Sequence, residues 1–190
     1  MALPDAATLE REYLAGRWDF LRDTREVARY GVVSAWLHHF LEAGSVLDLG
    51  CGEALLFPYL DARRIRGYVG LDVSRTALDR ARIDPERARL LQTSVEDYVP
   101  APDERFDAIL FNEVLGYLGD PLSQIARYRS FLAPGGILIL SIYQTPRESS
   151  GARKITRAIW EMLDRDWTVL DETTLVNVGR DLTWRLRVAR

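Results

Sequence analysis

Cysteine is almost absent from this chain of 190 residues, and its single copy, Cys51, cannot form an internal disulfide. Histidine occurs only twice, so no cluster of cysteines and histidines is available to bind zinc. Every apolar run falls short of the roughly 18–20 residues that would cross a bilayer, and the acidic amino terminus lacks the apolar core of a signal peptide. We therefore expect a cytoplasmic protein with neither a bound metal nor a membrane partner.

An excess of basic charge is also missing. The 25 lysines and arginines are outnumbered by 28 aspartates and glutamates, which gives a net charge of -3. No large positive field is available to attract nucleic acid, and we expect no nucleic-acid partner. Hydrophobic residues make up 47% of the chain and charged residues 28%, a composition typical of a globular domain.

The apolar pattern alternates between helical and strand periods, which predicts an α/β fold. Asp23 and Glu26 have the spacing of a capping box, so a helix is expected to begin there. Other helices are expected at about 8–15, 54–62, 75–83, 121–132 and 152–163. Strands are expected at 45–49, 67–72, 88–93, 106–112, 136–142, 167–177 and 182–188. We expect a single domain with a helical cap over 1–44 and a core over 45–190.

A glycine turn follows the first predicted strand. In an open parallel sheet a ligand binds at the carboxyl ends of the strands, so this turn is a candidate site. Gly50 and Gly52 allow positive φ angles and let a ligand approach main-chain N–H groups. Asp72 ends the second strand 20 residues after Gly52, the spacing at which a carboxylate accepts both hydroxyls of a ribose. Both features predict a bound nucleoside.

Two residues near this turn distinguish between kinds of nucleoside. The dinucleotide fingerprint requires a small residue where Leu55 stands, because helix and strand pack closely around the pyrophosphate. Asp48 would place a negative charge nearby, which is unfavourable beside a pyrophosphate and favourable beside an ammonium or a sulfonium. These residues disfavour NAD, and an NAD(P)-dependent oxidoreductase stays open as an alternative.

A family resemblance is carried by the order and spacing of the segments VLDLGCGEA, GLDVS, TSVEDY, FDAILFNEVLGYL and LAPGGILILSIY. Over about 46–143 the chain resembles the class I S-adenosylmethionine-dependent methyltransferases, in particular bacterial ones that act on sugars or secondary metabolites. The resemblance implies a three-layer, Rossmann-like sandwich whose seven-stranded, mostly parallel sheet has the order 3-2-1-4-5-7-6, with strand seven antiparallel. It also implies S-adenosylmethionine as cofactor, S-adenosylhomocysteine as product, and methylation of a small molecule at oxygen, nitrogen or carbon.

The resemblance further implies which residues bind the cofactor. The glycine turn would hold the methionine portion through Asp48, Gly50, Gly52 and the backbone of Cys51. Asp72 would bind the ribose, and Val73 would flank the adenine. Ser94 stands where the family commonly has an aspartate that accepts from the adenine amino group, while Val95 can donate its backbone N–H. Asn112, at the end of the fourth strand, would face the methionine end of the cofactor.

A general base is needed only if the methyl acceptor is a hydroxyl or a protonated amine. Glu113 is one candidate, because it directly follows the fourth strand. His38 and His39 are the other candidates; as neighbours on a helix at most one of them can point into a given site, and a structural or surface role is also open for either. Tyr117 and Tyr143 are expected to line the pocket for the methyl acceptor, and the polar loop 144–151 is expected to shape access to it.

An aromatic stretch at 13–20 contains Tyr13 and Trp18, which are further candidates for substrate contacts. The stretch either closes over the cofactor or packs against the edge of the sheet. A protein that binds S-adenosylmethionine without catalysis is a second alternative function, because no motif by itself establishes a pocket for a methyl acceptor. The oligomeric state is left open by the sequence.

Overall fold

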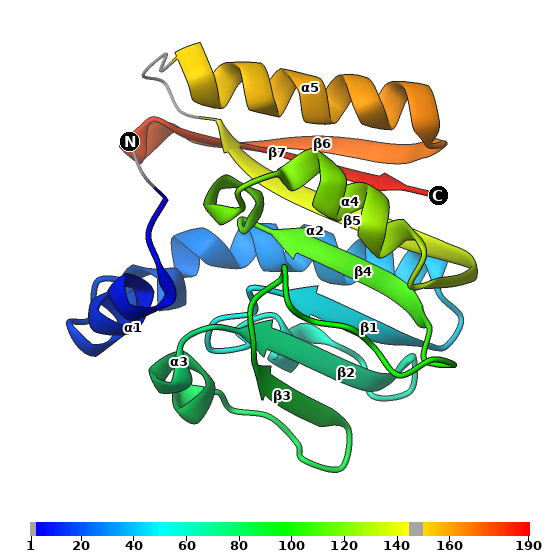
Figure 1. Cartoon of the computed structure of the whole chain (residues 1–190), viewed down its shortest axis with the longest axis horizontal. Helices are drawn as coiled ribbons and strands as arrows, with labels where there is room; N and C mark the ends of the chain where they lie inside the picture. The colour runs from blue at the N-terminus through cyan, green and yellow to red at the C-terminus, as the bar shows by residue number, and fades with distance from the viewer. Residues whose placement is uncertain (1–2, 145–149) are drawn as a thin grey trace.

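Seven strands form a single sheet in the order β3-β2-β1-β4-β5-β7-β6 (Figure 1). The computed structural model describes residues 3–144 and 150–190, so the predicted loop 144–151 lies largely outside the described residues. The strands are β1 Gly44–Leu49, β2 Ile65–Asp72, β3 Ala88–Gln92, β4 Phe106–Asn112, β5 Leu132–Gln144, β6 Val169–Asn177 and β7 Leu182–Ala189. Strands β1 to β5 run parallel, and β7 is antiparallel to β5 and β6. The predicted α/β class, strand order and antiparallel strand are confirmed.

Helices cover both faces of the sheet and make it a three-layer structure (Figure 1). On one face, α2 (Thr24–Phe40) packs its buried apolar residues against β1, β4 and β5. On the other face lie α4 (Pro121–Arg129) and α5 (Ser150–Asp166). Two short helices, α1 (Ala6–Leu14) and α3 (Arg75–Arg80), lie side by side near the carboxyl ends of the parallel strands (Figure 1).

The first helix-rich segment is part of the core as well as a cover for it. Val33 and Leu37 of α2 are completely buried beneath the sheet. Because α2 contributes to the same apolar layer as the strands, no separate core marks off residues 1–44 among the described residues. The division into a cap over 1–44 and a core over 45–190 stays a prediction.

One predicted helix is wrong. Residues 54–62 form turns and a three-residue 3-10 helix, η2 (Phe57–Tyr59), instead of an α-helix. Pro58 explains this outcome, because proline disfavours the helical conformation of the residue before it and has no N–H to donate. Ala54 adds a second interruption with a φ of 52°, outside the right-handed helical region.

The predicted capping box at the start of α2 is half correct. Asp23 caps the helix by accepting the N–H of Arg25 at 3.2 Å. Glu26 does not return to the N–H of Asp23, which donates instead to the carbonyl of Phe20 at 2.9 Å. The Glu26 carboxylate turns inward and pairs with Arg29 at 3.1 Å.

Within residues 3–144 and 150–190, no helix has the length and apolar character needed to cross a membrane. The same part of the chain contains no group of three or more His, Cys, Asp and Glu side chains placed to hold a metal ion.

Candidate functional site

The turn after β1 requires glycine at two positions. Gly50 and Gly52 have φ angles of 64° and 56°, in the left-handed region that favours glycine. A Cβ on Gly50 would lie 2.5 Å from a methyl group of Val114, and a Cβ on Gly52 would lie 2.6 Å from the hydroxyl of Tyr13. The predicted positive φ angles are confirmed, and the chain leaves no space for a larger residue at either position.

Asp72 fastens this turn to the next strand. Its two carboxylate oxygens accept the backbone N–H groups of Gly52 and Ser74, each at 2.8 Å. Burial raises the pKa of the Asp72 carboxyl, while the two N–H bonds oppose that shift. The structure thus brings Asp72 into contact with Gly52 of the glycine turn, and the contact of Asp72 with a ribose stays a prediction.

Asp48 is a buried carboxylate that lacks one of its partners. One oxygen accepts the hydroxyl of Tyr68 at 2.6 Å, and the other is buried with no hydrogen-bond partner. The side chain is 2% exposed, and burial raises its pKa to about 7. An unpartnered buried acceptor is costly, so this oxygen is suited to a donor or a positive charge supplied by a ligand.

Cys51 holds the turn through its backbone. Its N–H donates to the carbonyl of Leu71 at 2.8 Å, and its carbonyl accepts the N–H of Ala54 at 2.9 Å. Burial raises the pKa of the Cys51 thiol well above its ordinary value, so the thiol is neutral. The backbone contact of Cys51 with a cofactor stays a prediction.

Asn112, at the carboxyl end of β4, is held by a buried ion pair that the sequence did not reveal. Its side-chain oxygen accepts a hydrogen bond from Arg29, which also pairs with Glu26. Both charged side chains are 3% exposed. The available signal was the placement of Glu26 and Arg29 at core-facing positions of the α2 stripe that continues through Val33, where charged residues are rare.

Glu113 adopts a strained backbone conformation directly after Asn112. Its φ of 63° is uncommon for a residue with a side chain, and such conformations concentrate at functional sites. The carboxylate accepts the hydroxyl of Ser141 and, at 2.9 Å, the N–H of Tyr143. Burial raises the pKa of the Glu113 carboxyl, and the positive charge of Arg29 opposes the shift. The structure therefore fixes this candidate base at the carboxyl edge of β4 and β5.

The amino-terminal aromatic stretch lies over the glycine turn. The rings of Tyr13 and Trp18 stack with centroids 5.9 Å apart, and Trp18 meets the edge of Tyr117 at 6.1 Å. Residues on both sides fasten the stretch to the core. Before it, Glu10 accepts hydrogen bonds from the hydroxyls of Ser74 and Thr76, and after it Arg22 pairs with Glu53.

The structure does not bring His38 to this site, and a catalytic role for it stays a prediction. Its Nε2 accepts the N–H of Asp61 at 3.0 Å, just before β2 begins. That contact lies at the amino edge of the sheet, whereas the glycine turn and Glu113 lie at the carboxyl edge. His38 also follows Arg29 by nine residues on α2, a rise of roughly 13 Å along the axis.

The residues predicted to surround an adenine lie after β2 and β3. Ser94 exchanges hydrogen bonds with Asp97, donating its hydroxyl at 2.7 Å and accepting the N–H at 3.0 Å. Val95 is buried, and its carbonyl accepts the hydroxyl of Tyr128 at 2.8 Å. Val73 is half-buried at the end of β2. Their contacts with an adenine stay predictions.

A cavity of about 360 Å³ opens between the start of α2 and the β6–β7 hairpin. We call it the hairpin pocket; it is lined by Thr24, Arg25, Ala28, Arg29, Leu175, Val176, Asn177, Val178 and Trp184. Trp184 packs 6.4 Å from the ring of Tyr143, whose N–H is bonded to Glu113. The pocket therefore adjoins the carboxyl edge through both Arg29 and Trp184. Sequence reasoning missed it, because its walls are far apart along the chain.

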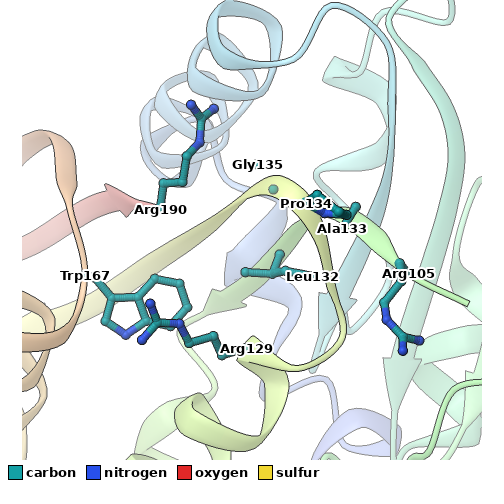
Figure 2. Close-up of a pocket in the computed structure, with 9 residues that line it drawn as sticks. Arg105, Arg129, Leu132, Ala133, Pro134, Gly135, Trp167 and Arg190 are labelled. Atoms are coloured by element: carbon teal, nitrogen blue, oxygen red, sulfur yellow. The ribbon is translucent and has the colours of Figure 1, made fainter.

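A second cavity, of about 370 Å³, lies at the opposite edge of the sheet where β5 begins (Figure 2). Arg105, Arg129, Trp167 and Arg190 line it together with the turn around Gly135, and the guanidinium of Arg129 lies 4.5 Å from the Trp167 ring centre (Figure 2). None of the predicted cofactor or methyl-acceptor residues lines either cavity, but Trp184 of the hairpin pocket contacts Tyr143.

Comparison with known proteins relates the chain to one family. A family model described as a methyltransferase domain matches residues 19–188. A ubiquinone biosynthesis O-methyltransferase of Cereibacter sphaeroides is 35% identical over 122 residues, which cover 62% of this chain and 48% of that protein. The chain thus spans about half the length of this relative.

Solved structures share the fold. The N-methyltransferase NodS of Bradyrhizobium japonicum, in complex with S-adenosylhomocysteine, superimposes with a TM-score of 0.76 at 23% identity over 97% of both chains. A 1,6-didemethyltoxoflavin N1-methyltransferase of Burkholderia thailandensis gives a TM-score of 0.73 at 18% identity, over 97% of this chain and 86% of that one.

Proposed function

This chain belongs to the methyltransferase-domain family, and from that membership we propose that it transfers a methyl group from S-adenosylmethionine to a small-molecule acceptor. The observation that carries the proposal is the unpartnered oxygen of Asp48 beside a turn that only glycine can form. A cationic nucleoside fits such a site, because the ligand supplies the positive charge that the buried carboxylate lacks.

The residues present at the carboxyl edge fit this cofactor. When bound, S-adenosylmethionine supplies a methyl group on a positively charged sulfur. Asp48 and the turn through Gly52 would hold the methionine portion, and Asp72 would accept the ribose hydroxyls in addition to its two backbone bonds. Asn112 would contact the methionine end, with its amide oriented by Arg29. The adenine would lie near Val73, Ser94 and Val95.

Glu113 is the residue placed to accept a proton from the methyl acceptor. Its bonds to Ser141 and Tyr143 fix the carboxylate, and its raised pKa makes the ionised form a stronger base. The remaining contribution is positional, because a methyl transfer in line with the departing sulfur depends on holding the two reacting atoms in contact. Such positioning contributes up to about 7–11 kcal/mol to a rate.

The hairpin pocket is the proposed site of the methyl acceptor. Its volume of about 360 Å³ suits a small molecule. Tyr143 and Trp184 connect its wall to Glu113, and Tyr117 adjoins the aromatic stretch over the glycine turn. The ubiquinone O-methyltransferase and the didemethyltoxoflavin N-methyltransferase are also named for small molecules, which supports this class of acceptor.

A dinucleotide is a poor fit to the same turn. A pyrophosphate is normally held at the amino end of a helix that follows the glycines, and here the glycines are followed by turns and a 3-10 helix of three residues. The negative charge of Asp48 would add repulsion when ionised. The oxidoreductase alternative therefore lacks the helix that would hold a pyrophosphate, and Asp48 makes the turn unfavourable for one.

Two measurements test the proposal. Isothermal titration should detect binding of S-adenosylmethionine and S-adenosylhomocysteine, and mass spectrometry should detect methylated products from a panel of phenols, amines and sugars. Absence of binding to either nucleoside would refute the proposed cofactor. Binding without any methylated product across the panel would favour the alternative of a cofactor-binding protein without catalysis.

A further inference from the structure

The hairpin pocket combines positive charge with an apolar wall. Arg25 and Arg29 lie one helical turn apart on α2, and no acidic residue is among the residues that line the cavity. The opposite wall, from the β6–β7 hairpin, is mostly apolar: it consists of Leu175, Val176, Val178 and Trp184 together with the polar Asn177. Val176 and Val178 are 63% and 88% exposed, so this apolar surface is open to a ligand.

Arg29 is a buried side chain with an unused hydrogen-bond donor. One terminal nitrogen donates to Asn112 and the other to Glu26. Arg29 is 3% exposed, and its Nε is buried without a hydrogen-bond partner. A guanidinium has five N–H donors, and leaving them unused in a buried place is unfavourable. Arg29 is therefore suited to bind an additional acceptor of hydrogen bonds.

The charges around the pocket favour an anion. Asp23 pairs with Arg25 at 2.6 Å and lies 4.0 Å from Arg180, while Glu26 pairs with Arg29. Arg25 and Arg180 thus share the single carboxylate of Asp23, which leaves an excess of positive charge at this corner of the pocket. Glu113 adds a negative charge on the far side of Arg29, beyond Asn112. A bound anion would be attracted to the arginines and repelled from Glu113, which orients the rest of the molecule toward β4.

We infer that the methyl acceptor is a small organic acid, whose anionic group binds Arg29 and Arg25 while its apolar body packs against Trp184 and Leu175. The inference rests on the proposed function, because it names the acceptor class of that same site. The anionic group serves as a handle, and the atom that receives the methyl group lies at the other end of the molecule, near Glu113.

Matched pairs of probes test this inference on the full chain saturated with S-adenosylhomocysteine. The pairs are 3,4-dihydroxybenzoate with 3,4-dihydroxybenzamide, 4-hydroxycinnamate with its amide, and hexanoate with hexanamide. Calorimetry should show that at least one acid binds about tenfold or more tightly than its amide, the effect of one charge-assisted hydrogen bond. Equal affinity within all three pairs, or no binding by any acid, would overturn the inference.

Substitutions then assign the preference to particular residues. Arg29→Gln and Arg25→Gln should each reduce the ratio of acid to amide affinity, and Arg29→Lys should retain part of it. Glu26→Gln should increase the ratio, because it removes the charge that competes for Arg29. Arg63→Gln is the matched control, since Arg63 is an exposed arginine paired with Asp61 just before β2. A ratio that stays unchanged in both Arg25→Gln and Glu26→Gln would overturn the inference even if Arg29→Gln fails to fold.

The acceptor class and the proposed function are tested by different measurements. Loss of the acid preference with normal binding of S-adenosylhomocysteine contradicts only the acceptor class. Failure of the wild-type chain to bind S-adenosylhomocysteine contradicts the proposed function, whichever probes bind in the pocket.

Discussion

Replacing Asp48 with asparagine should stabilise the protein without ligand, and the gain should depend on pH. The pKa of the Asp48 carboxyl is raised from its ordinary value of 3.8 to about 7, mainly by burial. The folded state therefore binds a proton more strongly than the unfolded state, and ionisation of this group opposes folding. The asparagine side chain would keep an oxygen for the Tyr68 hydroxyl and would carry no charge.

The sign and the size of this difference in the free energy of unfolding follow from the pKa values of Asp48 in the folded and the unfolded state. Below about pH 4 the carboxyl is protonated in both states, so the wild type and Asp48→Asn should have similar free energies of unfolding. Between about pH 4 and pH 7 the wild type should lose about 1.4 kcal/mol per pH unit relative to the variant. Above pH 7 the difference should level off at about 4 kcal/mol in favour of the variant.

Urea unfolding of both proteins at a series of pH values measures this difference directly. Taking the difference cancels the other groups that titrate in the same range. The variant should also bind S-adenosylmethionine more weakly, because the site has lost its negative charge. A stability difference that does not change between pH 4 and pH 8 would show that Asp48 is not held ionised against its burial.

Three other substitutions probe the same edge of the sheet. Asp72→Ala should weaken S-adenosylmethionine binding by about 1–3 kcal/mol in calorimetry, because a charge-assisted pair of hydrogen bonds is lost; unchanged affinity would refute its contact with the ribose. Glu113→Gln should lower the turnover rate more than the affinity for the cofactor, and an unaltered rate would remove Glu113 as a base. Gly50→Ala should lower the free energy of unfolding by at least about 1–2 kcal/mol, since its φ of 64° disfavours a side chain and Val114 fills the space; a thermal midpoint equal to that of the wild type would contradict this.

Much of the fold could be predicted because its signals are local. Strands β2 and β4 are short, mostly apolar runs that end in a polar residue, Asp72 and Asn112. Helix caps are also local signals: Ser74 and Asp120 each cap a helix with a side-chain oxygen, as residues of these types commonly do. Pro58 is a local signal too, and it marks the point where the predicted helix over 54–62 is interrupted.

The site was harder to predict than the fold, because its residues are joined by distant contacts. Asp72 and Gly52 were found through a spacing that the parallel sheet dictates. Arg29 and Trp184 share a cavity although 155 positions separate them in the chain, and no local pattern joins α2 to the last hairpin. His38 is a candidate through its chemistry alone, and its place near the end of α2 lies away from the glycine turn.

The fastening of α1 across the glycine turn has a consequence for the speed of the proposed reaction. A molecule seated on the turn must share space with the Tyr13 hydroxyl, which occupies the position of a missing Cβ on Gly52. Exchange of spent cofactor for fresh cofactor then requires the bonds of Glu10 to Ser74 and Thr76 to open and re-form. Loosening the contacts of Glu10 would therefore quicken this exchange.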